Sequence, residues 1–99
     1  MIFDEVDRGV GGAVAAAIGE RLARLAQSAQ ILVVTHSPQV AARADRHWLI
    51  RKSSDGLVAR TGIHMLDPKD RQEEIARMLS GAEITEEARA QAQRLLAAA

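Results

Sequence analysis

The sequence has no cysteine and only two aromatic residues, and its positive and negative charges cancel. Without cysteine, the chain cannot form disulfides or thiolate metal sites. Thirteen Lys and Arg residues balance thirteen Asp and Glu residues, and neither half of the chain is basic. This balance argues against a domain that binds nucleic acid through a basic surface. The sequence has no apolar run of about 18 residues and no secretory signal pattern, so no membrane partner is expected.

The length of 99 residues allows one domain with a modest core. Much of the apolar content is alanine, so the core has to come from Ile, Leu, Val and Met. A strand-like run at Met1–Phe3 is followed at once by two carboxylates, Asp4 and Glu5. Chain ends fray, so a natural domain seldom places such a segment there. We therefore expect a single partial domain over 1–99, with its chemistry in 1–45 and a hairpin and two helices in 46–99.

The first half of the sequence alternates strand and helix patterns. The predicted elements are a strand at 1–3, a helix at 13–26, a strand at 31–34 and a short helix at 38–44. Val14, Ile18, Leu22 and Leu25 recur every three or four residues and predict the apolar face of the first helix. The second strand is continuously apolar, which is typical of a parallel strand buried on both faces. This order predicts an α/β fold built on a βαβ unit.

The second half predicts a hairpin and two helices. Its strands are expected at 47–52 and 57–61, joined through Ser53–Gly56, which ends in an Asp-Gly turn signal. Helices are expected to start after the capping residues Asp67 and Thr85, and a third cap is expected at Ser37, before Pro38. Gly81 is expected to end the first of the two C-terminal helices. The remaining features are a basic group at Arg51, Lys52 and Arg60, interpreted as a solvated strand edge, and Trp48, interpreted as a packing residue.

Asp4 and Glu5 are the strongest local signal for chemistry. They directly follow an apolar strand, and successive residues point in different directions, so one carboxylate can hold a metal-bound water while the other orients an attacking water. This arrangement resembles the Walker B end of P-loop nucleotidases, where an aspartate at the end of a strand serves Mg²⁺. Asp-Glu pairs are also common on surfaces, so a solvated loop remains the alternative.

His36 follows the second predicted strand. Ligand sites in α/β sheets gather at the carboxyl ends of the strands, which would bring His36 to the edge where Asp4 and Glu5 lie. A histidine there can donate a hydrogen bond to a phosphate oxygen, although a turn histidine bonded to backbone is the plainer interpretation. His36, His47 and His64 lack zinc-ligand spacing, and no nucleophile-elbow motif occurs.

Two stretches carry a more specific pattern than any single residue. The first is Ile-Phe-Asp-Glu-Val-Asp-Arg-Gly-Val-Gly-Gly at 2–12, and the second is Ile-Leu-Val-Val-Thr-His-Ser-Pro-Gln-Val-Ala-Ala at 31–42. Together they resemble the RecN family of bacterial DNA repair proteins, which are SMC-like members of the ABC ATPase class. The resemblance extends through the hairpin, through 74–79 and through the helix after Thr85, and so covers essentially the whole chain.

The resemblance implies a role for each matching residue. Asp4 matches the Walker B aspartate that holds Mg²⁺ through water, Glu5 the general base that orients the hydrolytic water, and His36 the switch histidine that senses the γ-phosphate of ATP. The other residues assigned to the nucleotide-binding edge are Asp7, Gly9, Gly11, Gly12 and Gln39. Gly11 stands where many ABC relatives have an aspartate, which puts that carboxylate's D-loop role in doubt.

The sequence contains no Gly-x-x-x-x-Gly-Lys-Ser/Thr phosphate-binding loop. Leu79-Ser80-Gly81 is followed by Ala82 rather than a second glycine and is interpreted as a helix end. We therefore expect the C-terminal part of a P-loop ATPase head, inactive alone, that acts in DNA double-strand-break repair in the bacterial cytoplasm at the nucleoid. Its expected partners are ATP, Mg²⁺, the remainder of the head, a second head and DNA. The alternative is a non-catalytic module that docks on a partner head or on DNA, and the reading frame upstream of Met1 would discriminate between the two.

Overall fold

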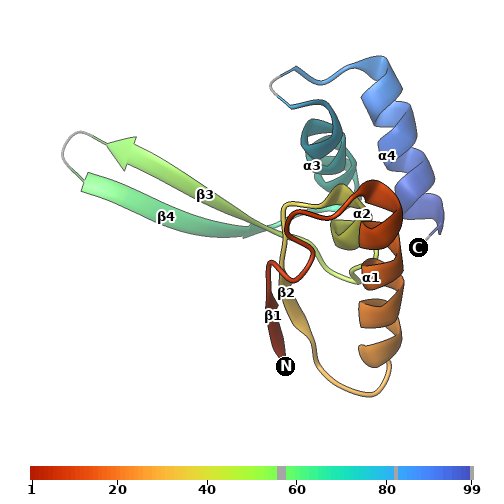
Figure 1. Ribbon diagram of the computed structural model, residues 1–99. Helices are drawn as coiled ribbons and strands as arrows, with labels where there is room; N and C mark the ends of the chain where they lie inside the picture. Colours follow the sequence, from red (N-terminus) through yellow and green to blue (C-terminus); the bar gives the residue numbers. More distant parts are fainter. Residues whose placement is uncertain (56–57, 82, 99) are drawn as a thin grey trace.

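The computed structural model describes residues 1–55, 58–81 and 83–98 and confirms the α/β class. The elements in chain order are β1 (Ile2–Asp4), α1 (Gly12–Leu25), β2 (Leu32–Val34), α2 (Pro38–Ala41), β3 (Trp48–Asp55), β4 (Val58–Met65), α3 (Pro68–Ser80) and α4 (Glu86–Ala98). The β1–β2 pair lies beside α1, helices α3 and α4 lie next to each other, and the β3–β4 hairpin projects away from the helices (Figure 1). No helix in the described ranges is long and apolar enough to cross a membrane.

β1 and β2 are parallel neighbours, as the sequence predicts. Phe3 and Val33 are register partners, and both pack toward the cluster that contains α1. The prediction that the second strand is buried on both faces is wrong, because Leu32 is 58% exposed and Val34 is 38% exposed. Side chains alternate between the two faces of a strand, and in the described residues only the face toward α1 is covered.

α1 presents small residues, rather than its largest ones, to the core. Its buried positions are Ala15, Gly19 and Leu22, whereas Val14 and Leu25 of the predicted apolar face are exposed. A Cβ at Gly19 would lie 3.1 Å from the Gln39 carbonyl oxygen. This close approach of α1 to α2 rotates the buried face away from Val14 and Leu25.

Two apolar clusters meet at α2. The first cluster centres on Ala15 and Leu22 of α1 and takes Val40 from α2. The second contains the fully buried Ile75 and lies between α2, α3 and α4; its buried members are Ala41, Ala42, Ile75, Ala76, Ala88 and Ala92. α2 therefore contributes Val40 to one cluster and Ala41 to the other, which anchors the loop that carries His36.

The capping predictions hold at two of three helices. The Asp67 carboxylate accepts the Asp70 N–H at 2.7 Å, and the Thr85 hydroxyl accepts the Ala88 N–H at 3.1 Å. Gly81 ends α3 with a φ of 84°, a region that favours glycine. Ser37 occupies the N-cap position of α2 but makes no capping hydrogen bond, because its hydroxyl donates to Gln39 Oε1 at 3.0 Å instead.

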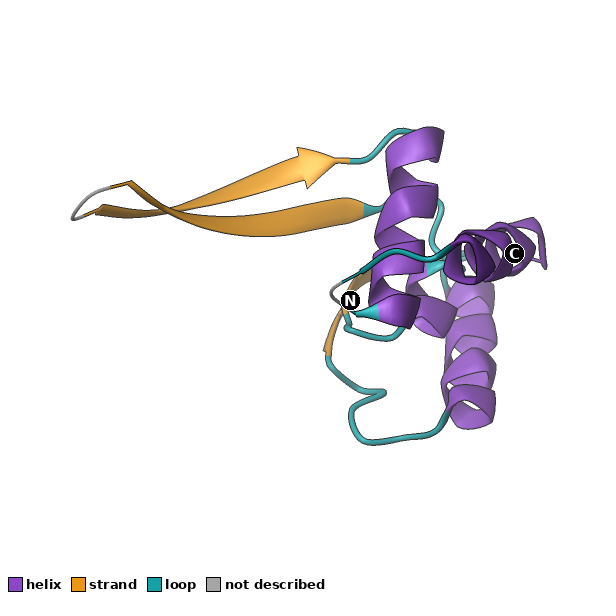
Figure 2. Ribbon diagram, turned by 90° about the horizontal axis from the view of Figure 1, so that it is seen from above, coloured by secondary structure: helices purple, strands orange, loops and turns teal. Residues whose placement is uncertain are grey.

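The hairpin is longer than predicted. Residues 53–55 belong to β3 rather than to a loop, and Gly56 and Leu57 of the predicted turn and second strand lie outside the described residues. The side chains of Lys52 and Arg60, from the predicted basic group, also lie outside them. Viewed from above, the paired strands extend well beyond the helices (Figure 2). Trp48, interpreted from the sequence as a packing residue, is 56% exposed in the described part of the chain.

Candidate functional site

Glu5 and His36 meet at the carboxyl ends of the two parallel strands. The Glu5 N–H donates to the Val34 carbonyl at 2.7 Å, which continues the strand pairing past Asp4. The Nε2 atom of His36 lies 3.0 Å from a Glu5 carboxylate oxygen, with 90% of the His36 side chain and 31% of the Glu5 side chain exposed. Two predicted site residues that are far apart in sequence are therefore in direct contact.

The backbone of Glu5 has a φ of 51°, in the left-handed region. A residue with a Cβ adopts this conformation at a cost of order 1 kcal/mol and needs its surroundings to hold it. The turn that follows is closed by the Arg8 N–H, which donates to the Glu5 carbonyl at 3.1 Å. The Arg8 guanidinium also lies 3.9 Å from the Glu5 carboxylate. The local backbone thus turns the Glu5 side chain toward His36.

A hydrogen-bonded chain connects the loop after β1 to the loop after β2. Asp7 is only 6% exposed, and its carboxylate accepts the Thr35 hydroxyl at 2.5 Å. The same hydroxyl oxygen accepts the Ser37 N–H at 2.9 Å. The sequence analysis assigned Asp7 to the site but missed Thr35. The available signal was a hydroxyl residue directly before His36 at the end of a strand.

A cavity of about 440 Å³ opens beside these loops. Six predicted site residues line it: Glu5, Asp7, Gly9, Gly12, His36 and Gln39. Met78 and Leu79 of α3 supply its apolar wall, which the sequence analysis did not foresee. A Cβ at Gly12 would lie 3.3 Å from Gln39 Nε2, so the start of α1 approaches this side chain closely.

Two predicted site residues lie outside that lining. Asp4 is the last residue of β1, is exposed and pairs in register with Val34. Gly11 is the N-cap residue of α1. The described residues contain no group of three side chains that could hold a metal ion by themselves. A lone exposed carboxylate does fit Mg²⁺, which keeps several waters and takes other ligands from substrate phosphates.

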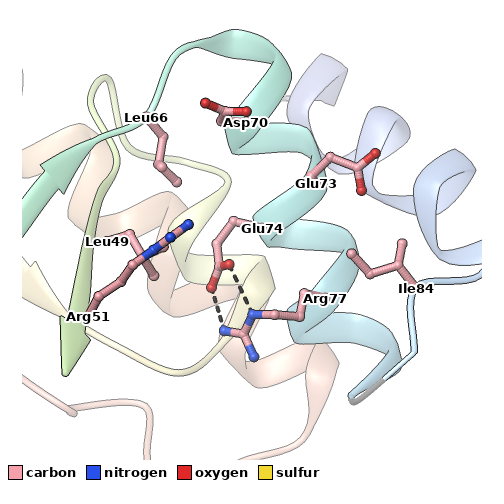
Figure 3. A pocket seen from close by; sticks show the side chains of 8 residues that line it. All are labelled: Leu49, Arg51, Leu66, Asp70, Glu73, Glu74, Arg77 and Ile84. Atoms are coloured by element: carbon pink, nitrogen blue, oxygen red, sulfur yellow. Dashed lines mark hydrogen bonds and ion pairs between the residues drawn. The ribbon is translucent and has the colours of Figure 1, made fainter. Parts of the chain in front are cut away.

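A second, smaller cavity of about 200 Å³ lies between β3 and α3. The side chains that line it are Leu49, Arg51, Leu66, Asp70, Glu73, Glu74, Arg77 and Ile84 (Figure 3). Arg77 Nε donates to Glu74 Oε2 at 2.9 Å, and this hydrogen bond raises the pKa of Arg77. The pair satisfies the buried Glu74 carboxylate. None of the predicted site residues lies here.

Comparison with known proteins shows which sequences this chain is similar to. No family model matches the chain. The chain is 58% identical over 95 residues to the DNA repair protein RecN of Streptomyces coelicolor and 52% identical over 99 residues to that of Mycobacterium leprae. It is 48% identical over 96 residues to RecN of Xylella fastidiosa. The chain is RecN-like.

This RecN-like chain spans 17% of the Streptomyces and Xylella proteins and 16% of the Mycobacterium protein, although the matches cover 96% or more of its own length. A solved chain from work on ATP-driven dimerization and DNA-stimulated activation of SMC ATPases matches with a TM-score of 0.62 at 17% identity. That match covers 84% of this chain and 49% of the solved one. The fold is thus similar to that of about half of this solved SMC ATPase chain.

Proposed function

We propose that this RecN-like segment supplies the water-activating edge of an ATP site in a DNA repair ATPase. The support is the contact between Glu5 and His36 at the edge where two parallel strands end, beside a cavity lined by glycines and polar side chains. Ligands of open α/β sheets bind at this edge. RecN-like sequence and an SMC-type fold make ATP the nucleotide that fits best.

In this proposal Glu5 is the general base. Its carboxylate accepts a proton from the attacking water and aims that water at the γ-phosphate. His36 is largely exposed, so its imidazole reaches outward to donate a hydrogen bond to a phosphate oxygen. Asp4 holds Mg²⁺ through water. When bound, Mg²⁺ neutralises charge on the phosphates.

The nucleotide-facing loops are proposed to come from both strand ends. Gly9 and Gly12 line the cavity without side chains of their own, and Gln39 contributes an amide next to Gly12. Asp7 lies behind them and holds the first loop against the second. Gly11 is the N-cap residue of α1 and directly precedes Gly12 of the lining.

The proposed assembly extends beyond these 99 residues. The phosphate-binding loop and the signature motif come from the remainder of the head, a second head pairs across ATP, and DNA is contacted by the assembled protein in the bacterial cytoplasm. Phosphoryl transfer relies on positioning and charge neutralisation, so the chain by itself does not hydrolyse ATP. ATP turnover by the purified 99-residue chain would contradict this statement.

The decisive variant is Glu5→Gln in a full-length protein that carries this segment. An amide cannot accept the water's proton, so turnover should fall by about 100-fold or more while ATP-dependent pairing of heads persists. Turnover is measured by phosphate release and pairing by sedimentation. His36→Ala should also lower turnover, because a hydrogen bond to the phosphate is lost.

Glu20→Gln is the matched control. Glu20 lies on the exposed side of α1, and among the described residues its ion pair is with Arg24, at 2.9 Å. Exposed ion pairs of this kind contribute little, so turnover should stay at the wild-type level. Equal turnover in the Glu5→Gln and Glu20→Gln proteins would remove Glu5 from the role of base.

A further inference from the structure

Thr35 has the central place among the hydrogen bonds of the site. It lies between Val34, the last residue of β2, and His36. Its hydroxyl donates to Asp7 Oδ2 at 2.5 Å and accepts the Ser37 N–H at 2.9 Å. One hydroxyl therefore ties the loop after β1 to the backbone on the far side of His36.

Asp7 depends on this hydroxyl. A carboxylate that is only 6% exposed needs hydrogen-bond partners, since burying it without them is unfavourable. The Asp7 backbone also belongs to the turn after Glu5, because that turn is closed over residues 5–8 by the Arg8 N–H, which donates to the Glu5 carbonyl at 3.1 Å. Fixing the Asp7 side chain thus fixes the turn that carries Glu5.

His36 depends on Thr35 in another way. Its side chain is 90% exposed, so packing does not hold it, and its described contact is with Glu5. The position of the imidazole is therefore set by the backbone at 35–37. Thr35 holds that backbone through the Ser37 N–H, and α2 anchors it one residue later, where the Ala41 N–H donates to the Ser37 carbonyl at 3.0 Å.

We propose that Thr35 is the positioning residue that holds Glu5 and His36 in place relative to each other. The catalytic part of this inference rests on the proposed function; the coupling of the two loops does not. Thr35 touches neither nucleotide nor water in this scheme. It acts through Asp7 on the loop of Glu5 and through Ser37 on the loop of His36.

Thr35→Val and Thr35→Ser form the matched pair of variants. Val keeps nearly the same shape and removes the hydroxyl, whereas Ser keeps the hydroxyl. In the chain itself, amide hydrogen exchange at Ser37 should be about tenfold faster in the Val variant and unchanged in the Ser variant. The Glu5 amide bonds Val34 instead, so its exchange should be the same in all three proteins and report that the strands remain paired.

In the full-length protein, Thr35→Val should lower kcat by about tenfold with KM for ATP within about twofold, because geometry rather than binding is lost. Thr35→Ser should restore kcat. A Thr35→Val variant with wild-type kcat or a wild-type Ser37 exchange rate overturns the proposal. A Thr35→Ser variant whose kcat is as low as that of Thr35→Val overturns it too.

Two further variants separate the possible failures. If Thr35→Val unfolds the chain, the Glu5 amide also loses protection from exchange. The Asp7→Asn variant then takes the place of Thr35→Val, since it weakens the hydrogen bond between Thr35 and Asp7 without removing either side chain. The Asp7→Asn variant should have a Ser37 exchange rate and a kcat that lie between those of the wild type and those of the Thr35→Val variant. Wild-type values of both quantities would overturn the proposal. If Glu5→Gln hydrolyses ATP like wild type, the proposed function and the catalytic part of this inference fail together. Ser37 exchange then decides the coupling of the loops alone.

Discussion

At the scale of single residues, Arg71 joins α3 to the end of α2. Its Nη2 atom donates to three carbonyl oxygens at and just beyond the C-terminal end of α2, those of Ala41, Ala42 and Ala44. His47 lies close to this guanidinium. Burial lowers the pKa of His47 below its ordinary value of 6.5, Arg71 lowers it further, and Glu74 opposes both effects.

This environment makes stability depend on pH in a defined direction. The pKa of His47 is lower in the folded chain than in the unfolded one, so below about pH 6.5 the unfolded chain binds more protons. The free energy of unfolding should therefore fall as the pH drops from 6.5 toward the folded pKa of His47. His47→Gln should remove this part of the slope, measured by urea unfolding at about pH 7.5 and about pH 5.

His64→Gln is the control for that measurement. His64 is exposed on β4, so its removal should leave the slope as it is in the wild type. If His47→Gln and wild type lose equal stability between the two pH values, the charge of His47 does not oppose folding.

Residue by residue, local interactions could be predicted and distant ones could not. The capping bonds of Asp67 and Thr85 each reach three residues along the chain, so sequence spacing was enough. The bond between Thr35 and Asp7 joins residues 28 apart, and only the parallel pairing of the strands brings them together. Glu5 and His36 could be placed at one edge because strand ends in a parallel sheet share that edge.

At the scale of elements, the contact between α1 and α2 is made through glycine. A Cβ at Gly19 would lie 3.1 Å from the Gln39 carbonyl oxygen and 3.2 Å from Val40 Cα, and backbone atoms cannot rotate aside. Gly19→Val should therefore push the helices apart and lower the free energy of unfolding by about 1–3 kcal/mol. In the full-length protein it should also lower ATP turnover, since α2 anchors the His36 loop.

Ala16→Val is the control on the same helix. Ala16 is exposed, so Val there brings the helix-propensity cost of a β-branched residue without a clash. The Ala16→Val variant should lose no more than about 0.7 kcal/mol of unfolding free energy, measured by chemical denaturation. Equal losses in the two variants would mean that Gly19 is not needed for close approach.

The bounds of helices and strands along the sequence could be predicted better than the faces that they bury. The bounds of α3 and its buried Ile75 follow from caps and spacing that the sequence displays. The buried face of α1 was misjudged because a periodic pattern scores large apolar residues, whereas the fold selects Ala15 and Gly19 for close packing. The second strand was misjudged because burial depends on what covers it, and a strand's own residues do not contain that information.

At the scale of the whole molecule, large apolar side chains lie on two open sheet faces. Ile2 and Leu32 are register partners and are 74% and 58% exposed. On the hairpin, two register pairs lie on one face and are more than half exposed: Trp48 with Met65, and Ile50 with Ile63. Soluble monomers seldom expose such contiguous apolar areas. The buried apolar side chains of the described residues lie instead among the helices and on the inner face of β1–β2, and these form the folded core.

This division predicts that the same substitution, Ile to Ala, costs much more stability at one isoleucine than at another. Ile75 is fully buried among α2, α3 and α4, so Ile75→Ala should cost about 2–5 kcal/mol of unfolding free energy through lost burial and a cavity. Ile63 is 61% exposed on β4, so Ile63→Ala should cost less than about 1 kcal/mol, the range of strand propensity.

Urea unfolding of the two variants, followed by circular dichroism, gives both values, and Ile75→Val extends the test if Ile75→Ala does not fold. That milder change should cost about 0.5–1.5 kcal/mol, because it removes one methylene from the same cluster. A cost at Ile63 equal to that at Ile75 would mean that the hairpin face is covered in solution, which contradicts a core confined to the helices and the inner sheet face. Both positions carry the same side chain before and after the change, so the difference between the variants comes mainly from burial, with a smaller part from the different propensities of a helix and a strand.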